Sequence, residues 1–299
     1  MFTAKQKTGV IYTISSAVLF GIVPVFARQA ATTGSNGETV AFLSNSMACV
    51  LLFFYMKMAG ISFSVTGKQL RHLIWIGCIG QGGTNILLYK AYLYIPIGMA
   101  TMIHFLYPLM VYAELVLLFQ QRPKLRELAG LCIAVTGMVV FMEKGAVSGL
   151  GMVMAFVSAI TFSAYVVGID KTPLKHMSAV VATFYISAFS SITIGIYNCL
   201  SGSFDMGITM TGYLYAGVAA LGGNVLAKIF LQKGIEKIDS DLAAVLSLFE
   251  PITSLIMGIL IYREILSIRK IIGSCMVLGA IVVITKNRNP APLITEKIK

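Results

Sequence analysis

The sequence predicts an all-α integral membrane protein with ten transmembrane helices, arranged as two inverted five-helix repeats. Three observations predict it: the composition, ten apolar spans and an internal repeat. The 299 residues are 57% hydrophobic and 12% charged, with a mean hydropathy of +0.85, whereas soluble domains carry about 25% charged residues. This composition leaves no separate soluble domain. The net charge of +11 sits in short loops, so it indicates membrane topology and no nucleic-acid partner.

Ten apolar stretches approach the length of helix that crosses a bilayer, about 20 residues. They cover about residues 9–30, 38–59, 70–92, 96–119, 126–143, 149–169, 177–200, 211–233, 241–262 and 269–285. With the N-terminus in the cytoplasm, 17 of the 23 lysine and arginine residues fall on the cytoplasmic side, as the positive-inside rule requires. We therefore expect a multi-pass protein of the cell membrane with both termini cytoplasmic.

An internal repeat divides the chain. At an offset of 143 residues the matches include Gly80 with Gly223, Pro108 with Pro251, and Gly130 with Gly273. At an offset of 142 the first span matches the sixth. Each unit holds five spans, an odd number, so the two units must cross the membrane in opposite senses. The predicted domains are repeats over 1–145 and 146–286, followed by a cytoplasmic tail over 287–299.

A carboxylate and a proline interrupt the ninth span, at Glu250 and Pro251. A charge in hydrocarbon costs several kcal/mol unless it faces protein or water, and a proline removes a backbone bond and bends a helix. Pro108 repeats the interruption in the fourth span, and matched interruptions of this kind point to a transporter's binding site. Glu250 is either a cavity carboxylate for a cation, proton or substrate amine, or a buried acid bonded to a neighbouring helix.

A second carboxylate, Glu114, follows Tyr107 by seven residues and so shares its helix face. Tyr107 is the repeat counterpart of Glu250. The two carboxylates could therefore share one vestibule, or Glu114 could reach the cytoplasmic surface. A cavity of net negative charge would favour a cation or an amine-bearing zwitterion over an anion.

The third and eighth spans carry matched polar pairs, Gln81 with Asn85 and Asn224 with Lys228. Members of each pair are four residues apart and share one helix face. Either both helices line one wet space, or these side chains form interhelical hydrogen bonds. For Lys228 the favoured interpretation is that it extends to the cytoplasmic surface.

His104 lies one turn before Pro108 and could carry a proton or pack as a hydrogen-bonded histidine. Aromatic side chains on the same spans could form a cage for a cation with Glu250, or could simply pack. These are Tyr12, Phe20, Tyr107 and Tyr165.

Small residues recur seven apart in the fifth span and again in the tenth. They are Gly130 and Gly137, repeated as Gly273 and Ala280. This spacing predicts a close helix–helix contact.

The interrupted fourth and ninth spans, the Phe249-Glu250-Pro251 motif, the Arg263-Glu264 ending and the glycine-rich last span resemble the EamA-type transporters of the drug/metabolite transporter superfamily. The resemblance covers about 9–285. It implies a central cavity between the first, third, fourth, sixth, eighth and ninth helices, with the fifth and tenth peripheral. It also implies transport, often export, of small solutes such as amino acids, choline or nucleobase-type metabolites. The first repeat departs from the pattern at Gln120-Gln121-Arg122 and at Glu114.

We therefore expect a secondary transporter that moves a small polar metabolite by alternating access, with export and proton coupling as finer expectations. Its partners are a small solute and the lipid bilayer, and a homodimer could form through the peripheral helices. No cofactor or metal is expected. An intramembrane enzyme and a non-transporting scaffold are the alternatives. His72, His104 and His176 form no HExxH motif, and no phosphate-binding GxxxxGK loop is present.

Overall fold

The computed structural model describes residues 3–121, 125–141, 148–262 and 267–285. All regular secondary structure in these ranges is helical, which confirms the predicted all-α fold class. Six helical stretches are long and apolar enough to cross a membrane, and shorter apolar helices cover 249–261 and 271–284. Adjacent helices combine into ten membrane-crossing units within the described ranges, as predicted.

The first repeat contains α1 (Ala4–Ala31), α2 (Gly37–Met58), α3 (Gly67–Trp75), the π-helical segment η1 (Ile76–Gly83), α4 (Thr84–Tyr94), α5 (Ile97–His104), α6 (Tyr107–Leu117) and α7 (Leu125–Phe141). The second contains α8 (Gly149–Lys171), α9 (Ala179–Ser201), α10 (Met210–Ala219), the π-helical segment η2 (Ala220–Ala227), α11 (Lys228–Leu246), α12 (Phe249–Tyr262) and α13 (Ile268–Thr285). Together, α3, η1 and α4 form the third span, and α10, η2 and the first part of α11 form the eighth.

Polar side chains begin several of these helices by accepting otherwise unpaired backbone N–H groups. Thr3 and Thr66 form reciprocal caps with the glutamines three residues on. Asn36 caps α2 and Thr209 caps α10. Gly202 ends α9 with a φ of 66°, a left-handed conformation that suits glycine. Helix boundaries therefore fall where the sequence turns polar.

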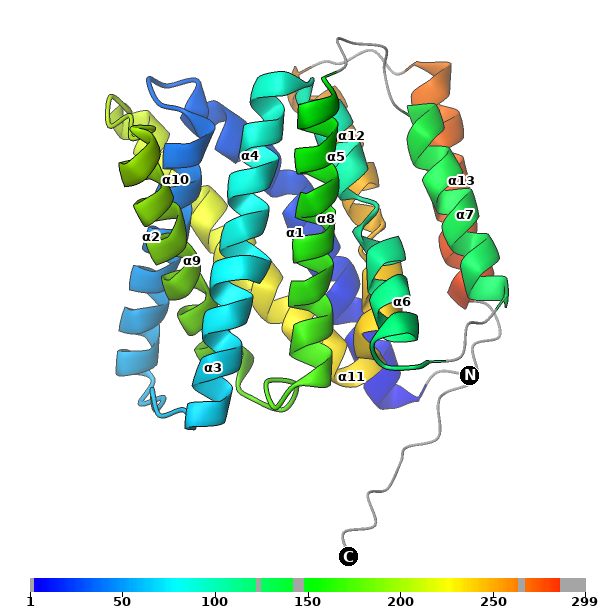
Figure 1. Ribbon diagram of the computed structural model, residues 1–299, viewed down its shortest axis with the longest axis horizontal. Coiled ribbons are helices and arrows are strands. Elements are labelled where there is room, and N and C mark those ends of the chain that lie inside the picture. The colour runs from blue at the N-terminus through cyan, green and yellow to red at the C-terminus, as the bar shows by residue number, and fades with distance from the viewer. Residues whose placement is uncertain (1–2, 122–124, 142–147, 263–266, 286–299) are drawn as a thin grey trace, which may run out of the picture.

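The helices of both repeats form one bundle (Figure 1). Helices α2 and α9 pack together at one side, and α7 and α13 pack together at the other. Between them, α1 packs along α11 and α12, while its repeat counterpart α8 packs along η1, α4, α5 and α6. We call the end where α1 begins and α13 ends the lower end, and the opposite end the upper end (Figure 1).

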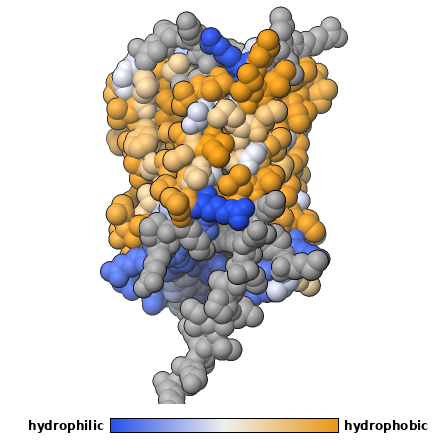
Figure 2. All heavy atoms as spheres, turned by 90° about the vertical axis from the view of Figure 1, so that its right-hand side faces the viewer, coloured by the Kyte–Doolittle hydropathy of each residue, from blue (hydrophilic) through white to orange (hydrophobic). Residues whose placement is uncertain are grey.

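An apolar belt covers the outer face of α7 and α13 (Figure 2). Hydrophilic side chains border this belt most heavily at the lower end (Figure 2). This surface is the pattern of a helical bundle that sits in hydrocarbon between two aqueous layers.

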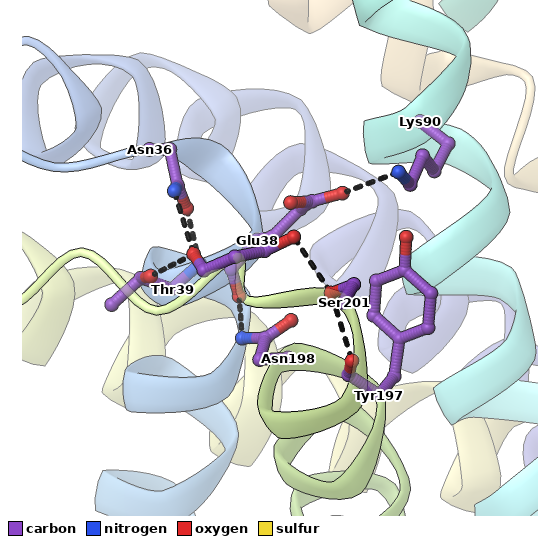
Figure 3. Close-up of polar contacts among 8 residues, drawn as sticks. Asn36, Glu38, Thr39, Lys90, Tyr197, Asn198 and Ser201 are labelled. Atoms are coloured by element: carbon purple, nitrogen blue, oxygen red, sulfur yellow. Dashed lines mark hydrogen bonds and ion pairs between the residues drawn. The ribbon is translucent and has the colours of Figure 1, made fainter.

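At the upper end, polar contacts join α2, α4 and α9 (Figure 3). The Glu38 carboxylate lies 3.8 Å from Lys90 Nζ, and that ammonium lies 5.5 Å from the centre of the Tyr197 ring. Asn198 donates a hydrogen bond of 3.2 Å to the Glu38 carbonyl. The start of α2 is thereby fastened to the ends of α4 and α9.

The third and eighth spans are not uniform α-helices. Each contains a π-helical segment, η1 or η2, at equivalent positions in the two repeats. Glycines there let neighbouring helices approach closely. A Cβ added at Gly77 would lie 2.6 Å from the Phe189 Cβ, and one at Gly223 would lie 3.0 Å from Val23. Short π-helical segments often mark functional sites.

The fourth and ninth spans are each broken by a two-residue turn. Helix α5 ends at His104 and α6 begins at Tyr107, while α11 ends at Leu246 and α12 begins at Phe249. Pro108 and Pro251 then fall in the first turn of the following helix, where the missing N–H needs no intrahelical partner. The chain therefore breaks just ahead of the proline, and no bent continuous helix results.

The predicted glycine seam is confirmed as the contact between α7 and α13. A Cβ at Gly137 would lie 2.9 Å from the Gly273 carbonyl oxygen, and one at Gly130 would lie 2.3 Å from an Ile284 side-chain carbon. Gly279, on the exposed side of α13, has no atom within 4 Å of such a Cβ.

We expect Gly137→Ala to destabilise the protein and Gly279→Ala to leave it unchanged or slightly more stable. Overpacking costs about 1–3 kcal/mol, whereas alanine in an open helix position gains about 0.5–1 kcal/mol over glycine. Thermal unfolding of the two purified variants in detergent measures the difference. Equal unfolding temperatures would contradict the close packing of α7 on α13.

Candidate functional site

Glu250 lies in the first turn of α12, directly after the break in the ninth span, and is half-buried. Its position depends on a close contact with α1. A Cβ at Gly21 would lie 2.7 Å from the Glu250 carbonyl oxygen, and Ser254 donates a hydrogen bond of 3.0 Å to the Gly21 carbonyl. A glycine in α1 therefore lets the first turn of α12, which carries Glu250, pack directly against α1.

Two tyrosines from the first repeat form the polar surroundings of this carboxylate. Glu250 interacts electrostatically with the hydroxyl groups of Tyr92 and Tyr107. The Tyr107 hydroxyl is also hydrogen-bonded to Ser247 in the turn between α11 and α12, and that of Tyr92 lies 3.3 Å from the Thr101 hydroxyl. Among the described residues, no lysine, arginine or histidine forms an ion pair with Glu250.

An aromatic layer continues from Tyr107 into α8. The Phe162 ring meets Tyr107 edge-on at 4.7 Å between centres and stacks on Tyr165 at 5.5 Å. Tyr165 is fully buried. Gln232 of α11 donates to the Tyr165 hydroxyl at 3.3 Å and to Thr183 at 3.0 Å. Both repeats therefore contribute to one central layer.

His104 is a packed histidine in this layer. It is 8% exposed, and its ring lies 5.4 Å from that of Phe162. Its Nδ1 lies 3.0 Å from the Ser158 hydroxyl, which itself donates to the Ala155 carbonyl. The hydroxyl proton is committed to that carbonyl, so Nδ1 carries the proton in this arrangement and Nε2 is the free acceptor.

Glu114 and Glu250 have different contact partners. Its carboxylate accepts a hydrogen bond from Ser163 of α8, and the side chain is half-buried. No hydrogen bond or ion pair in the described chain joins the two carboxylates, and a vestibule shared by them stays a prediction. Glu114 instead fastens α6 to α8.

The matched polar pairs occupy different surroundings. Gln81 is buried, and its amide donates a long bond of 3.4 Å to Asn85. Asn224 is half-buried on η2. Lys228 does not extend to the surface, which corrects that interpretation. It is 1% exposed, and its Nζ lies 3.4 Å from the Asn45 side-chain oxygen in α2.

The aromatic residues expected to form a cage pack at different places. Phe20 packs against the large core cluster that also contains Tyr107 and Tyr165. Tyr12 instead packs on Phe230 at 5.7 Å, under Lys233. Two small pockets of about 10 Å³ each lie beside Pro108 and Pro251. Each has room for about one water molecule, so neither is the solute site, and the central cavity stays a prediction.

The two ends of the bundle are packed differently. At the lower end, α11 packs against α6 and α8. At the upper end, α4 and α5 are the repeat equivalents of α11, while α12 and α1 are those of α6 and α8. Neither α4 nor α5 makes more than marginal contact with α12 or α1. Inverted repeats in identical conformations would give equal packing, so the two repeats adopt different conformations, with the lower end the more tightly packed.

Several residues of this layer are not among the site residues predicted from the sequence. Tyr92 continues the face of Gln81 and Asn85 at helical spacing, and Ser247 matches His104 at the offset of 143. The sequence therefore contained a signal for both Tyr92 and Ser247. Phe162 matches the candidate aromatic Phe20 at the offset of 142, so a signal existed for it too, although its contact with Tyr107 depends on how α8 packs against α6.

The sequence matches the EamA-like transporter family twice, over residues 7–142 and again over 149–286. The chain belongs to the EamA-like transporter family. Two proteins of Archaeoglobus fulgidus, each named "Uncharacterized transporter", are similar to it. One is 23% identical over 274 residues, covering 90% of this chain and 93% of the relative. The other is 23% identical over 267 residues, covering 84% and 92%.

The fold also resembles a solved crystal structure, described only as that of a protein, with a TM-score of 0.75. The sequences are 17% identical, and the match covers 92% of this chain and 97% of the other. Family membership and the ten-helix fold establish a multi-pass membrane transporter. EamA-like proteins are a transporter family rather than an enzyme family.

We expect Tyr107→Phe and Ser247→Ala each to reduce stability by about 0.5–1.5 kcal/mol, the usual net contribution of one hydrogen bond. The double variant should lose little more than the larger single loss, because both changes remove the same bond. The free energy of unfolding of the three variants measures this coupling. Fully additive losses would show that the two hydroxyls do not interact.

Proposed function

We propose that this transporter carries a small, amine-bearing polar solute, such as an amino acid or an amine, and that Glu250 binds the ammonium group. One observation carries the proposal. Glu250 is a half-buried carboxylate at a helix break inside the bundle, with no ion-pair partner in the described chain. Membrane proteins keep ionisable groups at such positions chiefly for solutes, ions or protons.

The local electrostatics favour a cationic ligand. Glu250 lies in the first turn of α12, where the helix dipole stabilises negative charge. The hydroxyls of Tyr92 and Tyr107 interact electrostatically with the carboxylate. Aromatic rings such as that of Tyr107 are of the kind that attracts ammonium groups. Charge and geometry together suit an amine better than a phosphate or a dicarboxylate.

A proton and an amine would compete for the same carboxylate. Each ligand shifts a conformational equilibrium only through its different affinity for the two states, and competition at one group couples their binding. Proton-coupled exchange across the bilayer is the simplest outcome. The inverted repeat supports alternating access, because exchanging the conformations of the two halves reverses the open side.

In the membrane, we propose that the lower end faces the cytoplasm and that the protein exports its solute. The hydrophilic side chains concentrated at the lower end support this orientation (Figure 2). The units 1–145 and 146–286 would be the two repeats, with 287–299 as a cytoplasmic tail. Contact between α7 and α13 places both at one edge of the bundle, where a homodimer could form.

We expect Glu250→Gln to abolish binding and transport of amine solutes while the protein still folds and inserts. Removing the charge removes the ammonium partner but keeps the shape of the side chain. A thermal-stabilisation screen of amines, amino acids and organic anions identifies the ligand, and uptake into liposomes then measures transport. Glu114→Gln is the matched control and should keep both activities.

Unchanged transport by Glu250→Gln, with the same pH dependence as the wild type, would show that Glu250 is structural. An organic anion as the best ligand would overturn the substrate class, although the chain would still be a transporter.

The orientation is tested with single cysteines in a background lacking the five native ones. Cysteines in the 31–37 and 201–208 connections should react with an impermeant thiol reagent added outside cells. Cysteines in the 60–66 connection should react only after the membrane is opened. The reverse pattern would invert the assignment.

A further inference from the structure

A cluster of charged side chains joins α8 to the junction within α11 at the lower end. Lys175, in the connection after α8, lies 2.6 Å from Asp170 and 2.5 Å from Asp239. Ser240 donates a hydrogen bond of 2.8 Å to Asp170, and Lys171 lies 2.9 Å from the same carboxylate. The Asp170 side chain is 0% exposed. None of these residues contacts the Glu250 layer in the described interactions.

Two features show that this cluster is held under constraint. Asp239 has a φ of 64° and a ψ of 166° inside α11, a conformation that is essentially restricted to glycine and costs about 1–3 kcal/mol. Burial opposes the charge of Lys175, yet hydrogen bonds and charge from Asp170 and Asp239 outweigh it and raise the pKa of that amine. Lys175 therefore stays charged, and its two ion pairs hold a strained junction in place.

The repeat-equivalent positions do not carry the same residues as this cluster. The offsets of 142 and 143 map Asp170 onto Arg28, Lys175 onto Thr33, Asp239 onto Pro96 and Ser240 onto Ile97. These equivalents lie at the upper end and cannot form the same lysine–carboxylate set. Inverted repeats give two conformations of similar packing energy, so an interaction present at one end alone must bias the equilibrium between them.

We propose that Asp170, Lys175 and Asp239 form a latch that closes the lower end and makes the lower-closed conformation the resting state. The proposal rests on the alternating access of the proposed function. It agrees with the packing of α11 against α6 and α8, which their upper-end equivalents lack. Opening the lower end would break both ion pairs of Lys175 and release the strain at Asp239.

The latch also sets a requirement on how a transported solute binds. A solute can open the lower end only if it binds the lower-open conformation more tightly than the resting one. Weakening the latch should therefore populate the lower-open conformation without any solute.

Thiol accessibility of the purified full-length protein, without solute, tests this in a cysteine-free background. Leu242→Cys reports on the lower end, Thr101→Cys on the upper end, and Ala48→Cys on the packed α2–α9 contact. Leu242 and Ala48 are buried, and Thr101 is half-buried. Asp170→Asn should raise the labelling rate at position 242 about tenfold, because the lower-open conformation, populated to about 1–10% in the unchanged protein, becomes dominant. The same change should slow labelling at position 101. Labelling at 48 should not change.

Lys175→Met should reproduce both changes, and combining it with Asp170→Asn should add little, because either change removes the same bridge. Lys90→Met, which removes the ion pair with Glu38 at the upper end, is the control and should leave labelling at 242 unchanged.

Unchanged labelling at 242 in both latch variants would overturn the proposal. So would parallel increases at 242, 101 and 48, since that pattern means general loosening. The test needs no transported solute, so it is separate from the transport assay. A latch that responds as expected in a protein that moves no amine would contradict only the proposed function.

Discussion

The structure depends on keeping one carboxylate in the membrane interior. Hydrocarbon supplies no hydrogen bonds, so an ionisable side chain there must face protein or a wet space. The two-residue break before α12 places Glu250 in a first helical turn, and Gly21 lets α1 close against that turn. Tyr92 and Tyr107 then bring hydroxyls from the other repeat. In the proposed function, solute recognition would thus occur at the layer that joins the two repeats.

Inverted repeats explain how such a layer can serve both sides of a membrane. Exchanging the conformations of the two halves reverses the open end while the central residues stay in place. The repeats here are not equivalent in their charges. Glu250 has Tyr107 as its counterpart, and Asp170 has Arg28. The first difference gives the ninth span a carboxylate, and the second gives the lower end a lysine–carboxylate cluster that the equivalent residues of the first repeat cannot form.

Much of the fold could be predicted because its determinants are local. Hydropathy predicted the membrane spans, and the odd number of spans per repeat predicted that the two repeats cross the membrane in opposite senses. The spacing of Gly130 and Gly137 predicted the α7–α13 contact. The π-helical segments and the true depth of Lys228 could not be predicted, because each depends on which helix lies opposite. The hydrogen bond between Glu114 and Ser163 could not be predicted for the same reason. Helical periodicity predicts on which face of its helix Glu114 lies, but not which residue lies opposite. The partner that Glu114 contacts is Ser163 of α8.

The central claim is that Glu250 exchanges a proton for the amine of the solute. The most direct measurement is proton release when an amine-bearing ligand is added to the purified protein in weakly buffered solution, repeated across the pH range in which it stays folded. We predict that binding releases protons at the acidic end of that range and that Glu250→Gln releases none. Binding that releases no proton at any pH, or release that persists in Glu250→Gln, would contradict the claim.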